Sequence, residues 1–266
     1  MKVVLTVAGS DSGGGAGIQA DLRTFAAHGV HGTSAITAVT AQNSVAVLDW
    51  VALEPRMVVA QMEAVASDMD VAAVKTGMLA TAAIVSAVAG ALERLRLPLV
   101  VVDPVMVAKS GDRLLDRDAE TAYRERLLPL ATVVTPNLPE AEALLGRPVR
   151  TLVEMREAAR ALRAMGPRAV VVKGGHLEGD AVDVFWDGER LEDLPASRID
   201  TRNTHGTGCT YSAAIAARLA LGEPPLDAVR GAKAYLTEAI RGSYSVGRGH
   251  GPVDHLHLLT RRSRES

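Results

Sequence analysis

Short apolar runs alternate along the chain with longer stretches in which apolar and polar positions repeat at helical spacing. Apolar runs of this length, each ended by glycine or a polar residue, are typical of buried strands. The predicted strands cover residues 3–8 and 34–39 and the stretches VAAVKTG, LVVVDP, ATVVTPN and AVVVKGG. The predicted helices cover residues 18–27, 55–69, 81–94, a Glu- and Ala-rich stretch after residue 137, 153–165, YSAAIAARLAL and 226–240. Thr81 is placed to cap the third of these helices.

One part of the chain departs from this alternation. After Gly175, the stretch DAVDVFWDGERLEDL forms two short runs around Asp187 and Gly188, which predicts a hairpin. No long glycine- or serine-rich linker and no internal repeat interrupts the remaining strands and helices. We therefore expect residues 1–266 to form a single α/β domain with a mainly parallel sheet.

Composition narrows the classes of protein that remain. Aromatic residues make up only 3% of the chain and hydrophobic residues 48%, so the core must be built from Ala, Val and Leu. A net charge of −2, with no basic block except the tail RRSRES, argues against nucleic-acid binding. The single cysteine excludes an internal disulfide and a Cys-rich zinc site. No run of about 18 apolar residues is present and the first residues resemble a strand, so we expect a cytoplasmic protein without a membrane partner.

Polar residues follow the predicted strands at the points where the strands end. They are Gly9, Ser10, Asp11, Gln42, Asn43, Lys75, Thr76, Asp103, Asn137 and Lys173. In a parallel sheet these ends share one edge, and ligands bind along that edge. Loops are generally polar, but several of these residues are single charged groups next to a continuous apolar run. The pattern therefore predicts a ligand site at the carboxyl edge of the sheet.

The first glycine-rich loop, GSDSGGGAG, matches neither of two common phosphate-binding motifs. A Walker A loop ends in Gly-Lys-Ser/Thr, and this loop has no lysine. A dinucleotide fingerprint starting at Gly15 lacks the acidic residue expected about 20 positions further on. We interpret these glycines as allowing the backbone to approach a small ligand closely.

The stretch NTHGTGCT, residues 203–210, is the second candidate for phosphate chemistry. Gly206, Thr207, Gly208 and Cys209 precede an apolar, alanine-rich helix, so their N–H groups are expected at its positive end. That is a site for an anion, and a thiol placed there would have a lowered pKa. The alternative is a glycine turn with a small buried cysteine.

The chain contains, in this order, the motifs AGSDSGGGAGIQADL, TAQN, KTGM, DPVMVAKSG, TPNLPEAE, VKGGH and NTHGTGCT. Together they resemble the hydroxymethylpyrimidine and hydroxymethylpyrimidine-phosphate kinases of thiamin synthesis, which belong to the ribokinase-like superfamily. The resemblance extends over essentially the whole chain, to GHGPV near its end. It implies a three-layer α/β/α fold, ATP and magnesium as cofactors, and a homodimer. The implied activity phosphorylates 4-amino-5-hydroxymethyl-2-methylpyrimidine to its monophosphate and then to its diphosphate.

The resemblance also implies roles for the second glycine turn. The superfamily usually has an aspartate as general base where this chain has Cys209, a replacement that is common in the pyrimidine-kinase branch. The N–H groups of residues 206–209 would form the anion hole for the transferred phosphoryl group. We hypothesise that Cys209 accepts a proton in the first reaction, whose nucleophile is a neutral hydroxymethyl group. The second nucleophile is an ionised phosphate oxygen, which requires no base.

Further residues are assigned to magnesium and the nucleotide by the same resemblance. Asp103 and Glu140 would hold magnesium through water, because hard cations prefer oxygen ligands. Lys173, Asn137 and Lys109 would lie near the nucleotide. Taken alone, Glu140 fits an ordinary acid in the first turn of a helix better than a metal ligand. Asp103, which precedes Pro104, could equally be a turn residue. The two lysines could be ordinary solvated side chains.

The predicted pyrimidine pocket consists of Gln42, Gly9, Asp21, Met78 and Val105. The primary amide of Gln42 offers one acceptor and two donors, which complements the ring nitrogen and amino group of an aminopyrimidine. Met78 would pack on the ring and Val105 would act through its backbone. Taken alone, Gln42 could cap a neighbouring loop, and Asp21 could be a polar-face helix residue.

Three of the seven histidines are candidates for a function, and none of the three receives a predicted role. His205 precedes the glycine turn and could simply shape it, and His255 and His257 lack a third ligand for a metal site. Two other functions compete with the pyrimidine kinase. One is a pyridoxal kinase of the same superfamily, and the other is a pyrimidine-binding regulator without catalysis.

Overall fold

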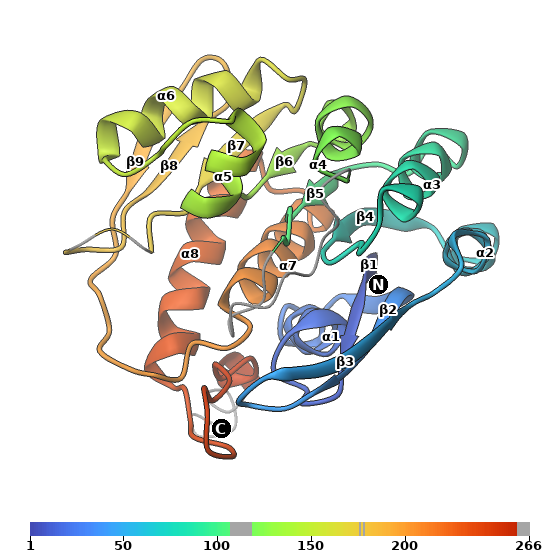
Figure 1. Cartoon of the computed structure of the whole chain (residues 1–266), viewed down its shortest axis with the longest axis horizontal. Helices are drawn as coiled ribbons and strands as arrows, with labels where there is room; N and C mark the ends of the chain where they lie inside the picture. Colours follow the sequence, from blue (N-terminus) through green and yellow to red (C-terminus); the bar gives the residue numbers. More distant parts are fainter. Residues whose placement is uncertain (107–118, 176, 178, 260–266) are drawn as a thin grey trace.

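Nine strands join in a single sheet in the computed structural model, which describes residues 1–106, 119–175, 177 and 179–259. Their order across the sheet is β3-β2-β1-β4-β5-β6-β7-β8-β9 (Figure 1). The strands are β1 (Val3–Asp11), β2 (His31–Gln42), β3 (Val47–Ala52), β4 (Val71–Thr76), β5 (Val100–Val102), β6 (Val133–Val134), β7 (Ala169–Val172), β8 (Asp183–Trp186) and β9 (Leu191–Leu194). The central strands from β2 to β7 run parallel, as predicted, and antiparallel strands complete both edges.

Helices cover both faces of the sheet, so the predicted three-layer arrangement is confirmed. One face packs against α1 (Gly17–Ala27), α7 (Thr207–Ala220) and α8 (Pro225–Arg241). The other face packs against α2 (Pro55–Asp68), α3 (Ala82–Arg94), α4 (Ala119–Ala122), α5 (Leu138–Leu145) and α6 (Leu152–Arg163). Each helical layer encloses its own apolar core against the sheet.

The two cores follow from the alternation of side chains along each strand. In β5, Val101 belongs to the core under α7, whereas Val100 and Val102 belong to the opposite core. Because both faces are covered, the central strands are apolar throughout rather than alternating. Helix α7 is buried nearly all round, which explains its alanine-rich sequence, since small side chains allow close packing on the sheet.

Local sequence signals account for most of the element boundaries. The Thr81 side chain accepts a hydrogen bond from the N–H of Ile84, so the predicted helix cap is confirmed. The predicted hairpin is also confirmed, because β8 and β9 pair antiparallel around Asp187. The Asp187 carboxylate accepts the N–H groups of Glu189 and Arg190, which stabilises the turn.

Strand β3 is the main element that the apolar pattern did not predict. It pairs antiparallel with β2, which is longer than expected and continues to Gln42. The Asn43 side chain accepts hydrogen bonds from the N–H groups of Val45 and Ala46 and so makes the connecting turn. Most of β3 is exposed at the edge of the sheet, which explains its lack of a continuous apolar run.

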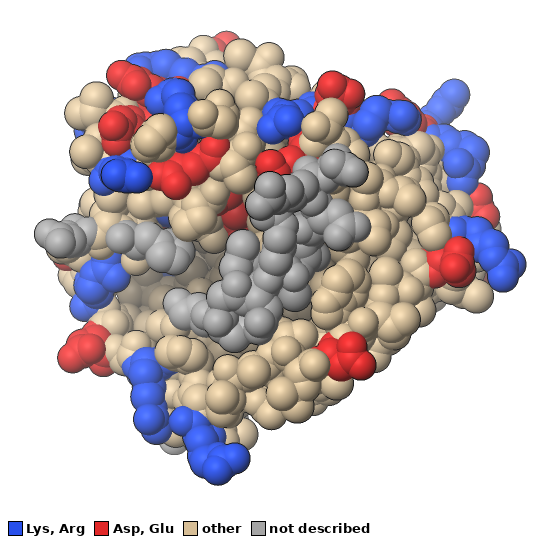
Figure 2. Space-filling view, in the orientation of Figure 1, with Lys and Arg blue, Asp and Glu red and all other residues tan. Residues whose placement is uncertain are grey.

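Charges of both signs are mixed over the face of the molecule drawn in Figure 2. Lys and Arg side chains lie among Asp and Glu side chains and do not gather into one basic patch there. Of the helices in the described ranges, none is both long enough and apolar enough to cross a membrane.

Candidate active site

The polar residues predicted at strand ends do lie at one edge of the sheet. They are Asp11 and Gln42, the last residues of β1 and β2, Lys75 and Thr76 at the end of β4, and Asp103, Asn137 and Lys173 just after β5, β6 and β7. These six strands are parallel, so their carboxyl ends face the same way. This is the edge at which open α/β sheets bind ligands.

Helix α7 begins in the glycine turn, as predicted, with Gly206 at its N-cap. A Cβ atom added to Gly208 would lie 3.5 Å from Lys173 Nζ and 3.6 Å from Asp103 Oδ2. Within the described chain, no acceptor pairs with the N–H groups of Gly208 and Cys209. The amino end of the helix therefore brings available N–H donors next to an ammonium group, a combination that suits a phosphate.

Asp103 and Lys173 form the charged centre of this edge. The Lys173 ammonium lies 2.8 Å from Asp103 Oδ1, which also accepts a hydrogen bond from the Thr135 hydroxyl. The other oxygen, Oδ2, accepts one from Ser212 of α7. Burial alone would raise the pKa of Asp103, but Lys173 and Lys75 outweigh it and hold that pKa below its usual value. Asp103 is therefore ionised and ties the end of β5 to α7.

Glu140 is the second carboxylate beside Lys173. Its Oε2 lies 3.9 Å from Lys173 Nζ and accepts a hydrogen bond from the backbone N–H of Asn137. Burial raises the pKa of Glu140 to about 7, with Lys173 opposing the shift and Asp103 adding to it. Its charge therefore changes within the range of neutral pH.

The two carboxylates fit the predicted magnesium site only in part. Asp103 and Glu140 supply hard oxygen donors on either side of Lys173, as a magnesium ion prefers. Over the residues that the structure describes, no cluster of three or more Asp, Glu, His or Cys side chains could hold a metal ion. An ion here would have to take its other ligands from phosphate and water, which is how magnesium commonly binds.

The two other predicted nucleotide ligands have different outcomes. The Asn137 side chain caps α5, because its Oδ1 accepts a hydrogen bond from the N–H of Glu140. Together with the Glu140 carboxylate it forms a capping box. The capping box holds the start of α5 next to Asp103 and Lys173. Asn137 therefore positions Glu140. Lys109 lies outside the described residues.

The Cys209 thiol corrects one expectation from the sequence. Its position at the amino end of α7 predicted a lowered pKa, but burial raises the pKa of Cys209 to about 11. Lys75 and the N–H of Gly17 oppose this shift, while the carboxylates of Asp21 and Asp103 add to it. Loss of water and two nearby negative charges thus outweigh the helix end. The thiol is therefore protonated at neutral pH.

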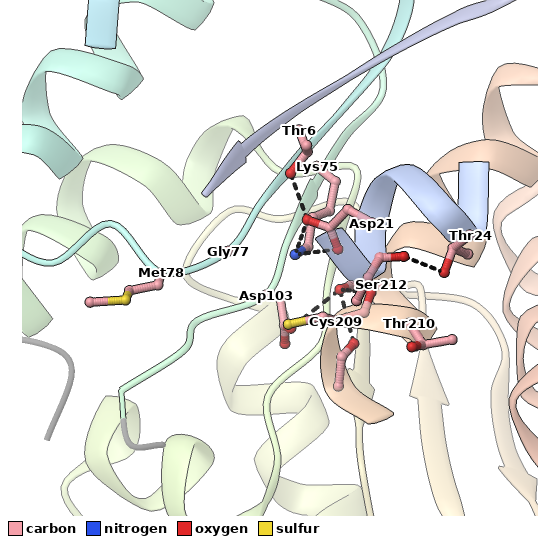
Figure 3. A network of polar contacts seen from close by, with 12 residues as sticks. Thr6, Asp21, Thr24, Lys75, Gly77, Met78, Asp103, Cys209, Thr210 and Ser212 are labelled. Carbon is pink, nitrogen blue, oxygen red and sulfur yellow. Dashed lines mark hydrogen bonds and ion pairs between the residues drawn. The ribbon is translucent and has the colours of Figure 1, made fainter. Parts of the chain in front are cut away.

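A completely buried ion pair, Lys75 and Asp21, lies near this thiol (Figure 3). Lys75 Nζ lies 2.9 Å and 2.8 Å from the two oxygens of Asp21, and the Thr6 hydroxyl donates to the same carboxylate at 2.6 Å. Both charged side chains are completely buried. Burial would lower the pKa of Lys75, but the attraction of Asp21 outweighs it and raises that pKa. The partners of Asp21, a predicted substrate ligand, are thus a lysine and a threonine.

The remaining candidates for the pyrimidine pocket are partly brought together. A Cβ atom on Gly9 would lie 3.1 Å from the Met78 sulfur, so these two residues touch. Met78 lies apart from the cluster around Cys209 in Figure 3. Val105 follows Asp103 in a tight turn, and the Gln42 amide oxygen accepts a hydrogen bond from a threonine hydroxyl. Their roles as pyrimidine ligands stay predictions.

A third buried network holds the chain just after Lys173, and the sequence pattern did not predict it. The N–H of Gly174 donates to Asp183 Oδ1 at 3.0 Å. Asp183 Oδ2 lies 2.7 Å from the ammonium of Lys233, a nearly buried residue of α8. No local motif joins these residues, because Lys233 is fifty positions further along the chain than Asp183. The network fixes the path of the backbone after β7 and thereby the position of Lys173.

Comparisons with known proteins identify the fold and the family. A solved ADP complex of Bacillus subtilis pyridoxal kinase superposes with a TM-score of 0.91 at 42% identity, covering 97% of this chain and 99% of that one. The fold is therefore that of a ribokinase-like small-molecule kinase. A family model described as phosphomethylpyrimidine kinase matches residues 11–254, and the chain belongs to that family.

Two relatives have similar sequences over nearly all of this chain. The hydroxymethylpyrimidine/phosphomethylpyrimidine kinase of Rhizobium meliloti is 55% identical over 259 residues, covering 96% of this chain and 97% of the relative. The thiamine biosynthesis bifunctional protein ThiED of Geobacter sulfurreducens is 53% identical over 254 residues, which are 95% of this chain but 52% of that protein. The chain thus spans about half the length of the Geobacter protein.

Proposed function

We propose that the protein transfers phosphoryl groups from ATP to 4-amino-5-hydroxymethyl-2-methylpyrimidine, first to the monophosphate and then to the diphosphate. The observation that carries this proposal is the meeting of Gly208, Lys173 and Asp103 at the amino end of α7. It supplies N–H donors and a positive charge where a phosphate can lie, in a chain of the phosphomethylpyrimidine kinase family.

Phosphoryl transfer asks the protein mainly for positioning and charge stabilisation. The N–H groups of residues 206–209 would hold the oxygens of the transferred phosphoryl group. Lys173 would exchange part of its contact with Asp103 for a phosphate oxygen. Magnesium would neutralise charge on the ATP phosphates, with Asp103 and Glu140 holding it through water.

The protonated thiol changes the role proposed for Cys209. With a pKa of about 11, roughly one thiol in 10,000 is ionised at pH 7. The thiolate is therefore too rare to act as the general base. We therefore propose that Cys209 acts as a hydrogen-bond partner that orients the hydroxymethyl group. In the second reaction the nucleophile is an ionised phosphate oxygen, which needs no such partner.

Two alternatives remain to be separated from this function. The similarity to a pyridoxal kinase keeps pyridoxal as a second candidate substrate, since its hydroxymethyl ring is chemically related. The higher identity to the Rhizobium enzyme favours the pyrimidine. A regulator that only binds the pyrimidine would not need the set formed by Asp103, Glu140 and Lys173.

A coupled assay of ADP release with three substrates tests all of these functions. The protein is incubated with magnesium and ATP and with the pyrimidine, its monophosphate or pyridoxal. We expect release with the first two and a much smaller kcat/KM with pyridoxal. Preference for pyridoxal would identify a pyridoxal kinase, and release with none of the three would favour the binding protein.

We also propose a homodimer, which the exposed edge of the sheet supports. Strand β3 exposes Leu48 by 72%, Val51 by 60% and Trp50 by 36%. An apolar edge strand of this kind is an aggregation hazard unless something covers it. Leu48→Glu should shift the mass measured by light scattering from dimer to monomer. Val153→Glu, at an equally exposed position on α6, should leave the dimer intact. A monomeric wild type would contradict the proposal.

A cytoplasmic location stays a prediction from the sequence.

A further inference from the structure

Asp11 joins the two glycine loops of the molecule through one carboxylate. Its Oδ2 accepts hydrogen bonds from the N–H groups of Gly15 and Ala16, at 3.0 and 2.9 Å, and its Oδ1 from Gly13 at 2.8 Å. The same Oδ2 lies 2.8 Å from Nε2 of His205, which is 194 positions away in the sequence. A single oxygen thus holds both the loop after β1 and the turn before α7.

His205 stands directly before the N–H groups that face Lys173. Its own N–H donates to the carbonyl of Gly251, and its side chain is mostly buried, so the residue is fixed at both ends. The next residue, Gly206, has a φ of 80°, a conformation that favours glycine. A Cβ atom there would lie 1.9 Å from the carbonyl oxygen of Gly15, so the two loops meet backbone to backbone.

The imidazole must donate its Nε2 proton in this arrangement. Asp11 accepts four hydrogen bonds and is only 3% exposed. Burial would raise the pKa of Asp11, but the hydrogen bond from His205 and those from the loop outweigh it and lower that pKa. An ionised Asp11 offers only acceptors, so His205 Nε2 is the donor whether the ring is neutral or charged.

We propose that His205 is a positioning residue for phosphoryl transfer. Its hydrogen bond to Asp11 fixes the position of the Gly206–Cys209 turn, so that the N–H groups of the turn face the oxygens of the transferred phosphoryl group. The inference rests on the proposed kinase function. N–H donors stabilise a transition state only when they are fixed in advance at the oxygens where charge develops. A displacement of about 1 Å far from the reacting atoms can lower a rate about 100-fold.

The test compares two nearly isosteric replacements that differ in the donor. His205→Gln keeps an N–H group that can reach Asp11, and His205→Met removes it. We expect His205→Met to lower kcat for both phosphorylations by about 10- to 100-fold while KM for ATP and pyrimidine stays within about threefold. His205→Gln should keep kcat within about fivefold of the wild type. His31→Met, at an exposed histidine where β2 begins, is the control and should leave kcat unchanged.

The outcomes separate the inference from the function on which it rests. Equal kcat in the two His205 variants, or a rise in KM as large as the fall in kcat, overturns the positioning role. If His205→Met does not melt cooperatively, Asp11→Asn takes its place in the comparison. A folded His205→Gln that loses kcat 100-fold would also overturn the positioning role. A wild type that releases no ADP removes both proposals. An active wild type with an equally active methionine variant removes only this one.

Discussion

Two lysine–aspartate pairs lie at the carboxyl edge of the sheet, and they differ in what surrounds them. Lys75 and Asp21 are completely buried, and the carboxylate is bound through both oxygens. Lys173 keeps 14% of its side chain exposed and faces a second carboxylate, Glu140, at 3.9 Å. The ammonium–carboxylate distance of 2.8 Å is the same in both pairs.

The different surroundings decide which of the two pairs can bind a ligand. A sealed pair with every partner in place cannot accept a ligand without breaking a contact that nothing replaces. A pair that opens beside free N–H donors can replace a carboxylate contact by a phosphate contact. We therefore propose that Lys75–Asp21 serves stability and the electrostatic surroundings of Cys209, and that Lys173–Asp103 binds phosphate. The role of Asp21 as a substrate ligand stays a prediction from the sequence.

Removal of Lys75 should have the largest effect on stability. Lys75→Met leaves Asp21 buried with an uncompensated charge and should lower the free energy of unfolding by about 3–5 kcal/mol in urea denaturation. The double variant Asp21→Leu/Lys75→Met removes both charges and should recover most of this loss. A single variant destabilised by less than about 1 kcal/mol would contradict the assignment.

Removal of Lys173 should instead act on catalysis. Lys173→Met should lower kcat by about 100- to 1,000-fold, the range found when one charge-stabilising group is lost. Its free energy of unfolding should fall by less than that of Lys75→Met, because solvent reaches this site. Lys2→Met, at an exposed position, serves as the control in the same assay. If Lys173→Met lowers the free energy of unfolding as much as Lys75→Met and lowers kcat by less than tenfold, the two pairs do not differ in role as proposed.

The Cys209 thiol lies close to both pairs, and their charges shift its pKa. Its alkylation rate by iodoacetamide should keep rising with pH toward about 11, where half of the thiol is ionised. Asp103→Asn should move this midpoint to lower pH, because the Asp103 charge raises the pKa of the thiol. Glu140→Gln is the matched control, since Glu140 is not among the main groups that shift the pKa of the thiol. A rate that already levels off near pH 8 would show that the thiolate forms readily.

The smallest effect concerns the pH dependence of stability around Glu140. Its pKa is raised from 4.5 to about 7 in the folded protein, so the folded state holds the proton longer than the unfolded chain. The resulting stabilisation is complete below pH 4.5 and is lost as the pH rises through about 7. Glu140→Gln should remove this part of the slope in urea denaturation between those two values. An unchanged slope would place the titrating group elsewhere.

Most of the fold was predictable because its signals are local. Apolar runs ended by polar residues marked the central strands, and Thr81 marked a helix start. Strand β3 was missed because its side chains are largely exposed at the edge, where no continuous apolar run is required. Its signal was the turn-forming Asn43, which stands between two stretches of strand-forming residues.

The site was predictable in its members but not in their pairing. Strand ends and the glycine turn identified Asp103, Lys173 and Cys209 as neighbours at one edge. Nothing local could show that Asp21 would meet Lys75 or that His205 would meet Asp11, since these contacts depend on how distant elements pack. The raised pKa of Cys209 has the same origin, because burial and distant carboxylates overcame the local effect of the helix end.

We propose that the edge formed by Lys173, Asp103 and the amino end of α7 phosphorylates the hydroxymethylpyrimidine twice. Phosphorus NMR of the protein with the pyrimidine, magnesium and excess ATP tests it most directly. We expect a monophosphate signal that rises first and a diphosphate signal that replaces it, with two ADP formed for each pyrimidine. ATP that stays intact in the presence of the pyrimidine would contradict this proposal.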